Sequence, residues 1–376
     1  MAKIILLTVS HGAAHRRVAA ALEQALRALD PSLAIRTEDM LAHTTPWFRA
    51  YYNSYEIPLR YWPALWGWIE GMQHDGRSTG PGWLYRRGAQ PLFRFLKDSD
   101  PDLVIATEVG ACELAALHKR EHGARFKLVG ATAGVDVDRP WAQPEVDLYP
   151  VAPGEPAESL ERAGVPPEKI LRCGLPVDPG FAAVGDRHEL RERLELRNDL
   201  PLVLVMFGGT GFGKAGRIVD EMKALRRPVQ TVYIAGRNAR LEDEVRRRCS
   251  GLAYAKALGW VSNMHEWMAA ADLLVSKPGG TTVLEAINSG LPLLALDPLP
   301  GAERRACELI ERWGVGCYVR RAGDLTPTLV RLLAHPEEAE AMRRQARARA
   351  RPHAAAEAAA AILKLLENRM ARCLAS

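Results

Sequence analysis

The feature that most constrains the fold is a glycine turn set between two short apolar segments in the second half of the chain. Residues 273–275 (Leu-Leu-Val) are typical of a short buried strand, and 277–280 (Lys-Pro-Gly-Gly) form the turn that follows. A helix is predicted to open at Thr281, and 291–296 is a second apolar strand. This order is half of a nucleotide-binding α/β unit. Because the first turn of a helix has free N–H groups and the positive end of its dipole, we expect it to bind phosphate.

The chain has 376 residues, enough for two domains, and its 48% hydrophobic and 25% charged residues are typical of a folded protein. Its net charge of +5 is weak evidence for any anionic partner, and we expect no nucleic acid. Six scattered cysteines without metal-ligand spacing predict reduced thiols and no zinc site. No apolar run approaches the roughly 20 residues that cross a bilayer, and the N-terminus is too short for a signal peptide. We therefore expect a cytoplasmic protein.

The N-terminal half begins with a second strand–loop–helix pattern. Residues 4–9 are predicted to be a buried parallel strand, 10–15 a loop of small residues, and 16–29 a helix. Such a loop lies outside the carboxyl end of its strand, where active sites of doubly wound folds are found. His15 at its end could accept a proton from a hydroxyl, although it could also cap the helix or merely be exposed.

The segment 46–69 is unusually aromatic. Five of the nine tryptophans lie between Trp47 and Trp83, the others being Trp62, Trp66 and Trp68, and arginines are interleaved with them. Aromatic rings with neighbouring cations suit the headgroup region of a bilayer. The alternative is that these rings pack internally beneath a long insertion. The polar segment 74–82 that follows is predicted to be a loop.

A second glycine loop lies in the C-terminal half, after a predicted strand at 202–207. Residues 207–213 (Phe-Gly-Gly-Thr-Gly-Phe-Gly) have neither the Gly-x-Gly-x-x-Gly spacing of nicotinamide-binding proteins nor a Walker lysine. Backbone N–H groups of such a loop can still approach phosphate closely.

Several motifs together resemble the donor site of GT-B glycosyltransferases that use UDP-sugars. The closest patterns are those of processive diacylglycerol glucosyltransferases, monogalactosyldiacylglycerol synthases and, more distantly, the peptidoglycan transferase that acts on lipid I. The resemblance rests on segments 12–15, 173–181, 207–213, 236–238, 259–264, 277–281, 285–286, 290–292 and 300–303. The family's glutamine is replaced by Ala302, its aspartate after the strand at 127–132 by Ala133, and its histidine after the strand at 102–106 by Glu108.

The resemblance implies an α/β chain of the GT-B fold, with two Rossmann-like domains facing across a cleft. The expected division is an acceptor and membrane-facing domain at 1–172, a linker at 173–198, a UDP-sugar domain at 199–350, and a helix at 351–376 that crosses back. The implied reaction moves a hexose from UDP-glucose or UDP-galactose to a lipid hydroxyl, with inversion and without metal or cofactor. The expected acceptor is diacylglycerol, at an anionic membrane surface on the inner face of the cell membrane.

The resemblance also assigns residues. For the UDP-sugar they are Gly208, Gly209, Thr210, Gly211, Arg237, Val261, Met264, Lys277, Gly279, Gly280, Thr281, Glu285 and Glu303. For catalysis they are His15, Glu108 and Asp136, where Glu108 could instead cap the helix that follows it and Asp138 is an alternative to Asp136. For the acceptor and membrane they are Gly12, Trp47, Trp62, Trp66, Trp68 and Trp141.

Three alternatives remain at this level. A UDP-N-acetylglucosamine 2-epimerase would share the fold and the UDP site, but it needs no lipid and does not explain the aromatic segment. A glycosyltransferase could use a non-lipid acceptor. The departures at Ala302, Ala133 and Glu108 also permit an inactive nucleotide-sugar-binding protein.

Overall fold

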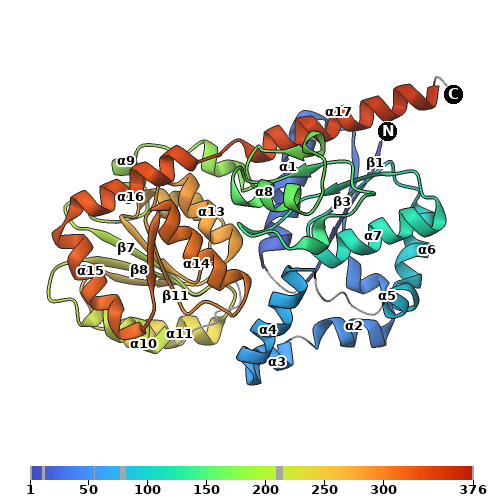
Figure 1. Ribbon diagram of the computed structural model, residues 1–376. Coiled ribbons are helices and arrows are strands. Elements are labelled where there is room, and N and C mark those ends of the chain that lie inside the picture. Colours follow the sequence, from blue (N-terminus) through green and yellow to red (C-terminus); the bar gives the residue numbers. More distant parts are fainter. Residues whose placement is uncertain (1, 11–12, 55, 77–81, 209–214, 375–376) are drawn as a thin grey trace. The chain divides into compact units, whose positions relative to one another are not determined.

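The computed structural model describes residues 2–10, 13–54, 56–76, 82–208 and 215–374, which form two compact units (Figure 1). Unit 1 comprises residues 1–179 and 351–376, and unit 2 comprises residues 180–350. The segment 173–198, expected to join two domains, is therefore divided between the units after Pro179.

Unit 1 is built on a parallel sheet whose strands lie in the order β2–β1–β3–β4, with a two-stranded sheet of β5 and β6 beside it. The strands are β1 (Lys3–Thr8), β2 (Ala34–Asp39), β3 (Leu103–Ala106), β4 (Lys127–Gly130), β5 (Tyr149–Pro150) and β6 (Ile170–Leu171). Every residue of β3 is buried, as is every residue of β1 after Lys3. Burial on both faces explains why these strands are continuously apolar rather than alternating.

The helices of unit 1 include one from the far end of the chain. They are α1 (Ala13–Leu29), α2 (Pro46–Asn53), α3 (Glu56–Tyr61), α4 (Pro63–His74), α5 (Gly82–Gly88), α6 (Gln90–Ser99), α7 (Val109–His122), α8 (Glu155–Arg162) and α17 (Ala354–Leu374). The last of them, α17, packs against α1 (Figure 1). It buries small side chains at helical spacing, Ala354, Ala355, Ala358 and Ala359, so the two backbones can approach closely.

The aromatic segment 46–69 forms α2, α3 and most of α4. Phe48 of α2 is fully buried, and a side chain on Gly88 would collide with its ring at 2.2 Å. The helix α4, in contrast, has no buried residue at all. Among the described residues, no helix combines the length and the apolar character needed to cross a membrane.

Unit 2 is built on six parallel strands in the order β12–β11–β10–β7–β8–β9. The strands are β7 (Leu202–Met206), β8 (Gln230–Ile234), β9 (Ala255–Leu258), β10 (Leu273–Ser276), β11 (Leu293–Leu296) and β12 (Gly316–Val319). Numbered one to six along the chain, they read 3-2-1-4-5-6 from β9 to β12, which is the order of a Rossmann fold. The prediction of this fold class is therefore confirmed for unit 2.

The helices of unit 2 include α13, which follows the glycine turn from which the sequence analysis started. They are α9 (Arg187–Arg193), α10 (Ala215–Lys223), α11 (Ala239–Cys249), α12 (Met264–Ala270), α13 (Gly280–Asn288), α14 (Ala302–Trp313), α15 (Leu325–Ala334) and α16 (Pro336–Arg349). The predicted strand, glycine turn, helix and second strand are thus β10, residues 277–279, α13 and β11.

Candidate functional site

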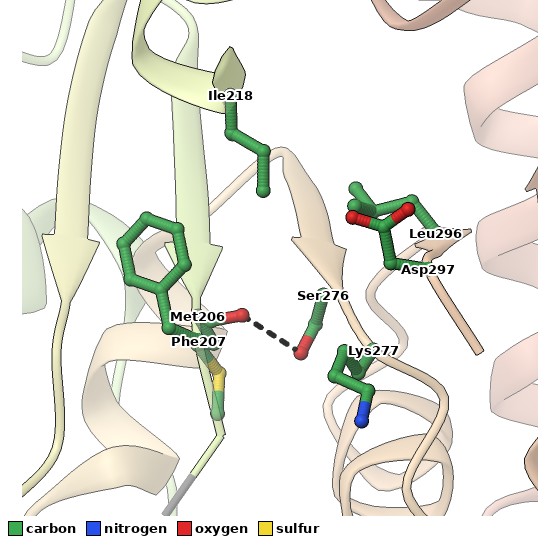
Figure 2. Close-up of a pocket in the computed structure, with 7 residues that line it drawn as sticks. All are labelled: Met206, Phe207, Ile218, Ser276, Lys277, Leu296 and Asp297. Carbon is green, nitrogen blue, oxygen red and sulfur yellow. Dashed lines mark hydrogen bonds between the residues drawn. The ribbon is translucent and has the colours of Figure 1, made fainter. Parts of the chain in front are cut away.

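The donor side of the candidate site lies at the switch point of the unit 2 sheet. The strands β7 and β10 are neighbours, and the connections that follow them lead to opposite edges of the sheet, which opens a crevice at their carboxyl ends. A pocket at this position encloses about 210 Å³ of empty space, part of it open to solvent (Figure 2). Its lining residues are Met206, Phe207, Ile218, Ser276, Lys277, Leu296 and Asp297. The two glycine loops that are predicted to bind phosphate follow β7 and β10, at this edge of the sheet.

The first of these loops begins with Gly208, whose φ of 74° lies in the left-handed region that glycine adopts without strain. Beyond it, Gly209, Thr210 and Gly211 lie outside the described residues, so their assignment stays a prediction.

The second loop ends at the N-terminus of α13, whose N-cap residue, Gly279, has no side chain to cap it. Gly280 and Thr281 begin the helix. Among the described residues, a methyl group placed on Gly279 would meet nothing closer than the Thr282 hydroxyl, at 3.9 Å. The N–H groups and the dipole of the helix favour an anion at this end.

An ion pair connects the loops after β10 and β11. The Lys277 amine lies 3.2 Å from Glu303, and the Leu299 N–H donates to the same carboxylate oxygen at 2.7 Å. Glu303 lies in the first turn of α14, so the pair joins α14 to the edge of the pocket. This arrangement holds a cation beside the site at which we predict the diphosphate.

The remaining donor residues lie near the same edge of the sheet. Arg237 follows β8, and its guanidinium lies 4.3 Å from the centre of the Trp260 ring, after β9. Val261 comes next, and Met264 begins α12. Glu285 is buried within α13, and its assignment to the UDP-sugar remains a prediction.

In unit 1, His15 lies in the first turn of α1, at the corresponding switch point between β1 and β3. Its Nδ1 lies 2.7 Å from the Thr107 carbonyl oxygen at the end of β3. Because a carbonyl can only accept, Nδ1 must carry the proton, which leaves Nε2 of the neutral ring as the acceptor. This tautomer is the one a general base needs. The neighbouring Gly12 lies outside the described residues.

The Glu108 carboxylate is engaged within the fold. One oxygen accepts the Ala111 N–H at 2.9 Å, which makes Glu108 the N-cap of α7, and the other accepts the Tyr52 hydroxyl at 2.6 Å. The capping alternative is thus confirmed, and a separate role toward the acceptor stays a prediction. The partner Tyr52 was not foreseen, because nothing in the local sequence of α2 indicates a contact 56 residues away.

Asp136 lies in the loop after β4, beside an unforeseen histidine. His74, expected in a polar loop, is instead the last residue of α4, and its Nδ1 lies 3.6 Å from Asp136 and 2.6 Å from Asp138. The Trp141 ring is only 5% exposed and belongs to the hydrophobic core of unit 1, so it presents no surface to a membrane. Its assignment to the acceptor stays a prediction.

The other aromatic predictions fit the structure better. Trp62 and Trp68 are 60% and 61% exposed, and Trp47 is 43% exposed, whereas Trp66 is partly buried. Further exposed apolar side chains on the same run of helices are Tyr51, Ile57, Tyr61, Leu65 and Trp83.

Comparison with known proteins finds a matching family model for each unit. Residues 15–177 match the family model of monogalactosyldiacylglycerol (MGDG) synthase, and residues 202–361 match the glycosyltransferase family 28 C-terminal domain. The chain is a glycosyltransferase of the GT-B fold. Its first unit is similar to MGDG synthase, and its second is similar to the family 28 C-terminal domain.

Two curated relatives are similar over most of the chain. A processive diacylglycerol beta-glucosyltransferase from Bacillus pumilus is 23% identical, with 93% of this chain and 92% of the relative covered. The chloroplastic monogalactosyldiacylglycerol synthase of Spinacia oleracea is 26% identical, with 87% and 65% covered.

Solved structures share the fold at lower identity. Anabaena HepE in complex with UDP has a TM-score of 0.57 and 16% identity, covering 97% of this chain and 100% of that one. A UDP-GlcNAc 2-epimerase from Neisseria meningitidis has a TM-score of 0.61 and 14% identity, with the same coverage. The fold alone therefore does not separate a transferase from an epimerase.

A partly buried acid near Glu108 gives this part of unit 1 a pH-dependent stability. Burial, with the nearby Glu108 as the second cause, raises the pKa of Glu113 on α7 from 4.5 to about 8. Between these values the folded chain holds a proton that the unfolded chain has lost, so the free energy of unfolding falls as pH rises. We predict that Glu113→Gln removes a pH dependence on the order of 1 kcal/mol or more between pH 5 and 8.

The free energy of unfolding of unit 1 is measured by guanidinium denaturation at several pH values. Glu158→Gln, at an exposed position of α8, is the matched control and should follow the wild type. Parallel pH profiles for the wild type and Glu113→Gln would contradict the prediction.

Proposed function

We propose that this protein transfers a hexose from UDP-glucose or UDP-galactose to the free hydroxyl of diacylglycerol, with inversion at the anomeric carbon. The observation that carries the proposal is the His15 imidazole, whose Nδ1 proton is held by the Thr107 carbonyl in a unit of the MGDG synthase type. The similarity to a diacylglycerol glucosyltransferase and to a monogalactosyldiacylglycerol synthase supports the acceptor class.

In the proposed step, the acceptor oxygen attacks the anomeric carbon of the donor sugar. The bond from that carbon to the β-phosphate oxygen breaks, and UDP leaves with the electron pair. The acceptor proton passes to His15 Nε2, the nitrogen that the bond to Thr107 leaves unprotonated. Inversion follows from a single displacement on the face opposite the leaving group.

The departing diphosphate gains negative charge, and unit 2 supplies fixed positive charge for it. The uncapped N-terminus of α13 offers N–H groups and a dipole, and Lys277 lies at the edge of the same pocket. Because these groups are already held in position by the sheet and by Glu303, little reorganisation is needed as charge develops.

Membrane association is the second part of the proposal. The exposed rings of Trp62 and Trp68 would enter the headgroup layer, and the net charge of +5 favours an anionic surface. The protein would then bind peripherally, at the cytoplasmic face, and take its acceptor from the bilayer. An epimerase or a transferase with a soluble acceptor would have no use for such a surface.

The transfer is tested by measuring UDP release from each donor, with and without diacylglycerol in anionic vesicles. We expect release that depends on the lipid and falls at least about 100-fold in His15→Ala, because a general base contributes about 10² to 10⁴ in rate. Affinity for UDP should be unchanged. His353→Ala, an exposed histidine of unit 1, is the control.

Turnover that does not depend on lipid would indicate another acceptor. Epimerisation of UDP-N-acetylglucosamine would indicate that the protein is an epimerase. Tight UDP binding without turnover would indicate an inactive binding protein. Full activity of His15→Ala would remove this residue as the base.

The membrane surface is tested by vesicle sedimentation. Trp62→Ser combined with Trp68→Ser should weaken binding to anionic vesicles tenfold or more, since 1.4 kcal/mol of lost burial corresponds to a factor of ten. Tyr254→Ser removes a comparably exposed ring from unit 2 and should bind as the wild type does. Equal binding by all three proteins would exclude α4 as the membrane contact.

A further inference from the structure

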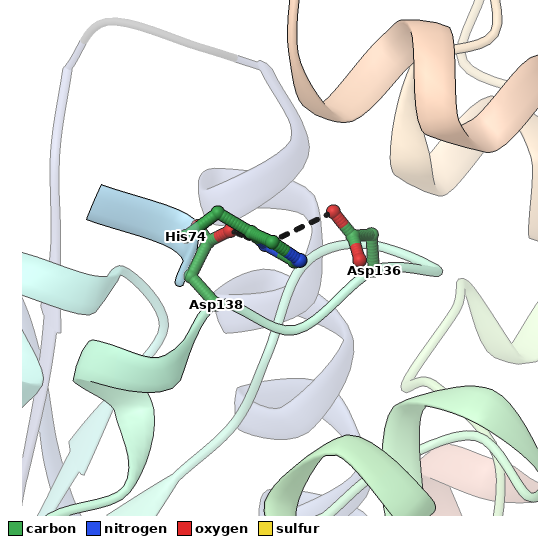
Figure 3. Close-up of side chains that lie close together, drawn as sticks. All are labelled: His74, Asp136 and Asp138. Carbon is green, nitrogen blue, oxygen red and sulfur yellow. Dashed lines mark hydrogen bonds and ion pairs between the residues drawn. The ribbon is translucent and has the colours of Figure 1, made fainter. Parts of the chain in front are cut away.

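Three side chains of metal-ligand type converge in unit 1 where the end of α4 meets the loop after β4 (Figure 3). They are His74, Asp136 and Asp138, and one ligand atom of each lies within 4.8 Å of the other two. The His74 Nδ1 is 2.6 Å from an Asp138 oxygen and 3.6 Å from an Asp136 oxygen. The histidine and the aspartates come from segments more than 60 residues apart, so tertiary packing alone brings them together.

Two buried valines alternate with the aspartates. Val135 and Val137 are 1% and 3% exposed, whereas Asp136 and Asp138 are more exposed and lie beside His74 (Figure 3). Val137 packs in the core of unit 1 together with Trp141, so the core holds the loop that presents the two carboxylates.

We propose that these three side chains bind a divalent transition-metal cation, Zn²⁺ or Mn²⁺. With a neutral imidazole the three groups together carry a charge of −2, which one divalent ion balances. Metal–nitrogen and metal–oxygen bonds of about 2.0–2.2 Å fit ligand atoms at these separations after small side-chain movements. The proton that now lies between His74 and Asp138 would be displaced by the metal.

The donor set favours this class of ion over others. An imidazole nitrogen with two carboxylates suits Zn²⁺ or Mn²⁺, whereas Mg²⁺ and Ca²⁺ prefer all-oxygen shells and Cu⁺ prefers sulfur. The side chains of His74, Asp136 and Asp138 are 25%, 11% and 31% exposed, so an ion can enter and water can complete its shell. The ion would tie α4, which carries Trp68 and directly follows Trp62, to the loop after β4. The inference does not depend on the proposed sugar transfer.

The test is a titration of the full-length protein, freed of metal by a chelator, with Mn²⁺ and separately with Zn²⁺. Calorimetry should give one ion per chain, and His74→Ala, Asp136→Asn and Asp138→Asn should each weaken binding at least tenfold. Asp98→Asn removes an exposed carboxylate of α6 in the same unit and should bind as the wild type does. Pulsed EPR of bound Mn²⁺ should show coupling to an imidazole nitrogen that disappears in His74→Ala.

Two features make the result decisive. Mn²⁺ binds thiolates poorly, so the free cysteines do not imitate the site. The asparagine variants keep the shape of the aspartates, and thermal denaturation in chelator verifies that unit 1 is folded. Absence of saturable one-to-one binding to the wild type, or equal binding by all three variants, would overturn the proposal. Sugar transfer is measured separately, by UDP release, so failure of the metal proposal and failure of the proposed function are distinguishable.

Discussion

Parallel pairing of the strands is the constraint on which the rest of the structure depends. In a parallel sheet every strand ends at the same edge, and the helix that follows begins there with unpaired N–H groups. Both sheets therefore gather loops at one edge: those after β7 and β10 in unit 2, and those after β1 and β3 in unit 1. This rule accounts for the position of the predicted anion site in unit 2 and of the candidate base, His15, in unit 1.

Within unit 1, two hydrogen bonds join the aromatic helices to the loops at that edge. Tyr52 of α2 donates to Glu108, the residue after the Thr107 carbonyl that orients His15. His74, at the end of α4, lies against Asp138 in the loop after β4. The helices that carry the exposed tryptophans are thus fastened to the loops that carry the candidate acid–base groups. The proposed acceptor contacts and the proposed catalytic groups would therefore share one support.

The sequence predicts the parts of this arrangement that are local. The turn at 277–280 and the strand at 202–207 are recognisable because glycines and apolar runs mark them within a few residues, and the structure has them within a residue or two. Glu108 as a helix cap is equally local. The pairing of His74 with Asp138, the bond from Tyr52 to Glu108 and the core position of Trp141 were not predictable in this way. They arise from packing between segments far apart in the chain, which leaves no periodic or spacing signal.

The central claim, that the N-terminus of α13 holds the donor's diphosphate, is tested most directly by the affinity of Gly279→Ala for UDP and for uridine. Among the described residues the added methyl meets no atom closer than 3.9 Å, so the fold should tolerate it, while we expect it to intrude on the proposed phosphate position. The account predicts UDP binding weakened at least tenfold, unchanged uridine binding and an unchanged melting temperature. Gly323→Ala, with open space around it, is the control. Unaltered UDP affinity in a folded Gly279→Ala would contradict the account.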